Sequence, residues 1–249
     1  IFFGQYAGKS HVCDQGGGPN VYIGKNAGSA STNTYNNVFI GPNAGAEAVV
    51  STTDNGDGHY NVYIGNSAGC KVIGKNRNVF IGNEAGCCAQ SGCSVIIGST
   101  IGWNADGGSN VLIGRCVAID SNYDAHSNVF MGYYTGEKNT TGAYNVFFGL
   151  KAGRCNTTGS KNIALGELAL GDETVTGDNN IAMGLCAGKN VTSGAGNISI
   201  GQQSMSLCTV TGSDNVAVGH CAGLEVTSGS YNVFLGYQAG SCVTTGSNN

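Results

Sequence analysis

The chain has 249 residues, a formal net charge of −4 and 10% charged residues, with 43 Gly and 2 Pro. Its charges form no run of Lys or Arg, which argues against nucleic acid or an anionic membrane as a partner. No stretch approaches the roughly 18 apolar residues of a membrane span, and a hydrophobic content of 41% is enough for a folded core.

One nine-residue motif recurs along the whole chain, which is the signature of a repeat architecture. It reads NVYIGKNAG at 20–28, NVFIGNEAG at 78–86 and NVFLGYQAG at 232–240. Its first glycine, here called the motif glycine, occurs 14 times, and after Gly65 the spacing stays between 16 and 18 residues. Helices of about 10 residues do not fit between corners this close. We predict an all-β chain, a parallel β-solenoid or β-roll of about 14 coils, forming one array over residues 1–249.

Two columns of the motif hold only apolar residues, and we call them the flanking columns. They lie three residues and one residue before the motif glycine, from Ile1 and Phe3 to Val233 and Leu235. Residues two apart in a strand share a face. We therefore predict that the flanking columns stack inside the coil, including Val21, Val38, Val62 and Val79.

The column between them, two residues before the motif glycine, is here called the middle column. Alternation places it on the outside, where polar residues are expected. It is nonetheless aromatic in eight of 14 copies and narrows to Ala or Ser at 164, 182, 199 and 217. An exposed stripe of this kind exceeds what a soluble monomer tolerates. We predict burial by another copy of the chain; the alternatives are a covering flap of the same chain or stacked aromatic residues that stay exposed. The self-association residues are Phe39, Tyr63, Phe80, Phe130 and Phe147.

The position four residues before the motif glycine holds asparagine in 12 of the 13 copies that show it, with Ser94 as the exception. Stacked amides form ladders in cross-β structures, so a structural ladder is expected here. A second polar column occurs in a recurring T-T-G pattern. Its hydroxyl residues either serve β-structure and turns alone or form a face that binds a glycan or ice. Its hydroxyl residues are Thr141, Thr158, Thr176, Ser193, Thr211, Ser228 and Thr245.

The N-V-x-I-G-x-x-A-G columns, joined by T-T-G-x-x-N linkers, resemble the head repeats of trimeric autotransporter adhesins. They resemble even more closely the repeat arrays of phage-type tail-fibre proteins that carry a self-cleaving chaperone domain. The resemblance covers essentially the whole chain. It implies a left-handed parallel β-roll, commonly a side-by-side homotrimer, that serves as a stalk or an adhesive head. Neither end departs from the repeat pattern, so we expect an excerpt of a longer array or a filament.

Eleven cysteines without any C-x-x-C pair favour an extracellular, cell-surface or virion-surface location over a zinc site. Cys70 and Cys87 each lie five residues past their motif glycine in consecutive coils. Their separation of one coil fits a disulfide. Cys88 and Cys93 flank one corner and form a second candidate pair. The alternative is that all the cysteines are reduced packing residues.

No consistent place in the coil holds a catalytic set, so we predict no enzyme, no cofactor and no metal site. Asp54 and Asp57 lie in the long insertion at 46–60, but their spacing does not match an EF-hand loop. Asn139, Asn156 and Asn190 occupy N-x-T sequons and are candidate glycosylation sites. The predicted function is a structural repeat module of an extracellular fibre. The alternative is an adhesive rod that binds a receptor, a glycan or ice.

Overall fold

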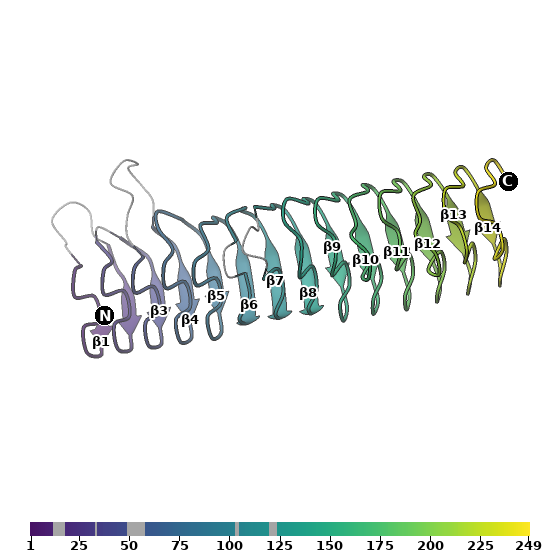
Figure 1. The fold of residues 1–249 in the computed structure, drawn as a ribbon. Helices are drawn as coiled ribbons and strands as arrows, with labels where there is room; N and C mark the ends of the chain where they lie inside the picture. The colour runs from purple at the N-terminus through teal and green to yellow at the C-terminus, as the bar shows by residue number, and fades with distance from the viewer. Residues whose placement is uncertain (12–17, 33, 49–57, 103–104, 120–123) are drawn as a thin grey trace. The chain divides into compact units, whose positions relative to one another are not determined.

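The computed structural model describes residues 1–11, 18–32, 34–48, 58–102, 105–119 and 124–249. The chain forms two compact units, Ile1–Ser127 and Asn128–Asn249. Each unit is a stack of coils with one short strand per coil (Figure 1). Within each unit, each strand pairs in parallel with the strand of the next coil. The fold is therefore a parallel β-solenoid, as predicted, and the described residues contain no helix.

The strands repeat at the motif. In the first unit they are β1 (Phe2–Phe3), β2 (Val21–Ile23), β3 (Val38–Ile40), β4 (Val62–Ile64), β5 (Val79–Ile81), β6 (Val95–Ser99) and β7 (Val111–Arg115). In the second they are β8 (Val129–Tyr133), β9 (Val146–Phe148), β10 (Ile163–Leu165), β11 (Ile181–Met183), β12 (Ile198–Ile200), β13 (Val216–Val218) and β14 (Val233–Leu235).

The middle column forms the core of the coil, which corrects the prediction of which face points inward. Phe39 and Phe130 are completely buried within their own chain. Val21, Val38, Val62 and Val79, predicted to stack inside, are only half-buried on the outer face. Alternation along the strand was predicted correctly, but its phase was wrong by one residue, and such a shift exchanges the two faces completely.

Stacked rings explain why the narrow interior takes the aromatic column. Tyr22, Phe39 and Tyr63 stack with centroids 4.9 and 4.7 Å apart. Phe130 and Phe147 stack at 4.7 Å, with an angle of 3° between the rings. These distances match the spacing of about 4.8 Å between paired strands. One ring per coil thus fills the interior from Phe2 to Phe80, and again at Phe130 and Phe147.

Two glycine positions let the chain close around the rings. Gly149, a motif glycine, has φ +133°, and a Cβ there would lie 2.7 Å from the carbonyl oxygen of Gly166 in the next coil. Gly45, four residues past its motif glycine, has φ +56°, and its Cβ would lie 2.6 Å from the ring of Phe39. Any larger side chain would clash with backbone in the first case and with the core in the second.

The asparagine column forms the predicted ladder. Asn145 donates its backbone N–H to Oδ1 of Asn128 at 2.8 Å, and its Nδ2 donates to the carbonyl of Gly159 at 2.9 Å. Asn162 repeats the first bond with Asn145, also at 2.8 Å. These amides are almost completely buried. They satisfy backbone groups at the corner before each strand, which is a structural role.

Candidate self-association surface

The outer face of the sheet consists of the flanking columns. In every strand from β2 to β14 the middle residue is buried, while the two residues beside it are half-buried or exposed. Phe148, for example, keeps 55% of its surface exposed. Both flanking columns are apolar in all 14 copies and hold no charge. Each unit therefore presents a continuous uncharged apolar strip to solvent, the kind of patch that marks interaction sites.

The five residues predicted to carry self-association lie in the wrong place for it. The rings of Phe39, Tyr63, Phe80, Phe130 and Phe147 are completely buried inside their own coils. They cannot contact another chain without unfolding, so the assignment of these residues is wrong. The apolar surface that the sequence pointed to exists, but it is made by their strand neighbours.

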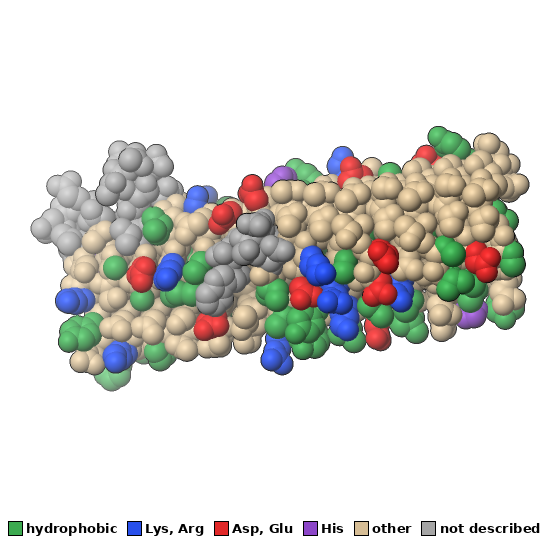
Figure 2. All heavy atoms as spheres, viewed as in Figure 1, with side chains coloured by type: hydrophobic (Ala, Val, Ile, Leu, Met, Phe, Trp, Pro, Cys, Tyr) green, Lys and Arg blue, Asp and Glu red, His purple; other side chains and the backbone are tan. Residues whose placement is uncertain are grey.

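Two pairs of opposite charges join neighbouring coils of the second unit. On the face drawn in Figure 2, hydrophobic side chains gather beside intermixed basic and acidic ones. Arg154 Nε contacts Glu137 Oε2 at 2.7 Å, and Lys189 Nζ contacts Asp172 Oδ2 at 2.7 Å, each pair joining two coils. The hydrogen bond to the carboxylate is the chief cause that raises the pKa of Arg154 and of Lys189.

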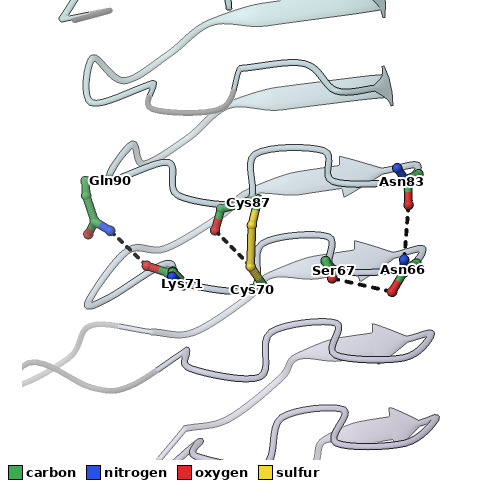
Figure 3. The surroundings of a disulfide bond; sticks show 7 residues. All are labelled: Asn66, Ser67, Cys70, Lys71, Asn83, Cys87 and Gln90. Carbon is green, nitrogen blue, oxygen red and sulfur yellow. Dashed lines mark hydrogen bonds between the residues drawn. A yellow bond between two sulfur atoms is a disulfide. The ribbon is translucent and has the colours of Figure 1, made fainter. Parts of the chain in front are cut away.

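The structure contains the predicted disulfide between Cys70 and Cys87 (Figure 3). Their Cα atoms are 4.9 Å apart, in consecutive coils. Nε2 of Gln90 donates to the carbonyl of Lys71 at 2.9 Å and ties the same two coils together. The disulfide therefore cross-links two consecutive coils of the first unit.

The second predicted pair is wrong, because Cys88 and Cys93 are both free thiols. The backbone N–H of Cys93 donates to the carbonyl of Asn76 at 3.0 Å, which fixes Cys93 to the preceding coil and not to Cys88. Cys155 is also free and is buried, and this burial raises the pKa of its thiol. It behaves as a packing residue.

Two of the three glycosylation candidates are also contradicted. Asn139 and Asn156 are completely buried, and Nδ2 of Asn156 donates to Oδ1 of Asn139 at 2.6 Å. A glycan on either amide would have to replace these interior bonds. Asn190 is half-buried and donates to the carbonyl of Ser206 at 2.9 Å. Glycosylation of Asn190 stays a prediction.

The hydroxyl column lies on the outside of the second unit. Its residues are exposed, whereas a threonine directly before four of them donates a hydrogen bond to the next coil. Thr140 Oγ1, for instance, donates to the carbonyl of Thr157 at 3.0 Å. The exposed members are Thr141, Thr158, Thr176, Ser193, Thr211, Ser228 and Thr245.

Asp54 and Asp57 lie outside the described residues. Among the residues that are described, no group of three or more His, Cys, Asp or Glu is placed to hold a metal ion. No described helix is long and apolar enough to cross a membrane. No protein-family model, curated protein or solved structure matches this chain.

Proposed function

We propose that this chain is a structural repeat module of an extracellular or surface fibre, and that it associates with further copies of itself through the flanking columns. The observation that carries the proposal is the uncharged apolar strip on the outer face of every coil. Burying apolar surface stabilises association by roughly 25 cal/mol per Å². A strip that repeats in each coil multiplies this small gain from coil to coil within each unit.

Two further features support a structural role. The middle column, the corner glycines and the asparagine ladder all serve the fold, so few residues of the repeat remain for chemistry. The Cys70–Cys87 disulfide favours an oxidising compartment outside the cytosol. A homo-oligomer or filament at a cell or virion surface is consistent with both.

The test is the oligomeric state of the purified chain, measured by analytical ultracentrifugation at a series of concentrations. We expect oligomers that dissociate on dilution. Replacing Ile163 and Ile198 with Lys places two charges in the strip, and we expect a monomer with an unchanged circular dichroism spectrum. Thr158→Lys adds a charge on another exposed column and is the matched control, which should still assemble. A wild-type chain that stays monomeric at every concentration would contradict the proposal.

The exposed hydroxyl column supports a second candidate, an adhesive rod that binds a glycan. Thr141 and Thr158 occupy consecutive coils, so their hydroxyls repeat at about 4.8 Å on an exposed surface. A glycan array should then show binding that is lost in a variant with both residues changed to Ala. Equal binding by wild type and variant would eliminate this candidate.

A further inference from the structure

A third column borders the outer face of the sheet. It consists of the residue directly after each motif glycine, two positions beyond the second flanking column. In β8 the three outer residues of one strand are Val129, Met131 and Tyr133, while Phe130 between the first two is buried. In the other coils of the second unit the strand ends before the motif glycine, so the third-column residue borders the apolar strip at the corner of the coil.

The two units differ in this column. In the second unit four of its seven residues are large, apolar or aromatic, and exposed: Tyr133 (40%), Leu150 (39%), Leu185 (42%) and Tyr237 (71%). The other three are Glu167, Gln202 and His220. In the first unit the column is Gln5, Lys25, Pro42, Asn66, Asn83, Ser99 and Arg115.

The polar column of the first unit has partners of its own. Nδ2 of Asn66 donates to Oδ1 of Asn83 at 3.2 Å, as Figure 3 shows. An apolar partner surface placed over these exposed amides would remove their water without offering hydrogen bonds, which is costly. The apolar strip is thus two columns wide in the first unit and three columns wide at four coils of the second.

Width decides whether such a strip can hold a partner. Seven strands at about 4.8 Å give the two flanking columns a length of roughly 34 Å and a width of roughly 10 Å with their side chains, and the third column adds roughly 5 Å of width at four coils. The footprint is roughly 430 Å² per copy, or about 870 Å² for two copies, which is the size of a weak interface and exceeds the roughly 800 Å² of most crystal-packing contacts. The two flanking columns alone, at roughly 680 Å² for two copies, fall below that size.

We infer that a second copy of this chain docks on the second unit, and that Tyr133, Leu150, Leu185 and Tyr237 are the anchors of this contact. The inference rests on the proposed function and adds to it where the copies meet. A second copy is the fitting occupant because its own strip repeats at the same interval from coil to coil. Side chains of one copy can then meet side chains of the other along the whole strip. Tyrosine is enriched among the residues that carry most of the binding energy of an interface, and the two leucines add apolar area that becomes buried.

The experiment compares full-length variants by analytical ultracentrifugation. Leu150→Ser with Leu185→Ser should weaken self-association roughly tenfold or more, because two apolar side chains lose their buried contacts. Leu207→Ser is the matched control, since Leu207 is an exposed leucine of the same unit that lies outside the strands. We expect it to leave association within about twofold of wild type. Circular dichroism checks that each variant keeps the solenoid.

The outcomes separate this inference from the proposed function. If the Leu150 and Leu185 variant assembles like wild type, while the Ile163 and Ile198 lysine variant is monomeric, the docking site lies on the flanking columns alone. The third column is then no anchor, although self-association stands. If the Leu207 control weakens assembly equally, the inference fails as well, because any lost surface leucine would suffice. A monomeric wild type overturns both proposals.

Discussion

Leu170 lies six residues after Ala164, at the position where coils with an aromatic middle residue carry glycine, and both side chains are completely buried. Ser199 and Met205 show the same relation, with a small residue in the middle column and a large one six residues later. Leu170 and Met205 adopt φ values of +49° and +43°, which cost a side chain roughly 1–2 kcal/mol. The coil accepts this strain because the large residue fills the volume that a ring occupies elsewhere.

This relationship predicts a compensating pair of substitutions. Ala164→Phe should destabilise the chain by about 1–3 kcal/mol, because Leu170 already fills the interior. Adding Leu170→Gly should recover stability, since Phe147 is the register partner of Ala164 and a new ring would stack on it. Urea denaturation of the wild type, both single variants and the double variant gives the coupling energy, expected at about 1–3 kcal/mol. Purely additive effects would show that the two positions do not share this volume.

A second prediction separates ring contact from backbone strain at the same glycine column. Gly136 and Gly188 have φ values of +57° and +54°. A Cβ on Gly136 would lie 2.5 Å from the ring of Phe130, whereas on Gly188 the nearest atom would be 3.2 Å away. Gly136→Ala should therefore cost about 1–3 kcal/mol more than Gly188→Ala in thermal or urea unfolding. Equal losses would mean that the backbone conformation, and not the ring, requires glycine.

The repeat allowed the fold to be predicted, because the spacing of the motif glycines and the alternation before them permit only short stacked strands. The phase could not be read in the same way, since both faces of the strand are apolar. The middle column was assigned to the outer face because the flanking columns hold only large apolar residues, whereas the middle column varies from Phe147 to Ala164. It varies inside the coil because Leu170 compensates, a relation between positions that a column-by-column comparison does not reveal.

The candidate site was predicted only in part. The two flanking columns and the middle column are all largely apolar. The sequence therefore predicts an apolar outer face suited to association, whichever of these columns points outward. The assignment of residues to that face depends on the phase, so it failed. The Cys70–Cys87 pair was predicted correctly because equal offsets from the motif glycine place residues one coil apart. Cys88 and Cys93 have unequal offsets, so proximity in sequence gave no guide to their distance.

Thiol reactivity provides a third prediction. Cys155 is buried and Cys242 is exposed, and both are free. Burial raises the pKa of Cys155, so at a given pH near 8 less of it is the reactive thiolate. Iodoacetamide should label Cys242 rapidly and Cys155 only slowly, with the order read from peptide masses. In denaturant the two rates should become similar, and fast labelling of Cys155 in the native chain would contradict its placement in the core.

The asparagine ladder provides the last prediction. Oδ1 of Asn162 accepts the backbone N–H of Asn180 at 2.8 Å, and its Nδ2 donates to the carbonyl of Gly177 at 2.9 Å. Asn162→Ala leaves both buried groups unpaired, at a cost of about 1–3 kcal/mol each.

Asn162→Ser is the informative comparison, because the chain already carries one serine in the ladder. Oγ of Ser94 accepts the backbone N–H of Asn110 at 3.2 Å, so a hydroxyl can replace the amide as acceptor. We therefore expect stability to fall from Asn to Ser to Ala in urea denaturation with an unchanged m-value. If Ser is no more stable than Ala, acceptance of the backbone N–H is not what the ladder contributes. The stabilising bond would then be the one that Nδ2 of Asn162 donates to the Gly177 carbonyl.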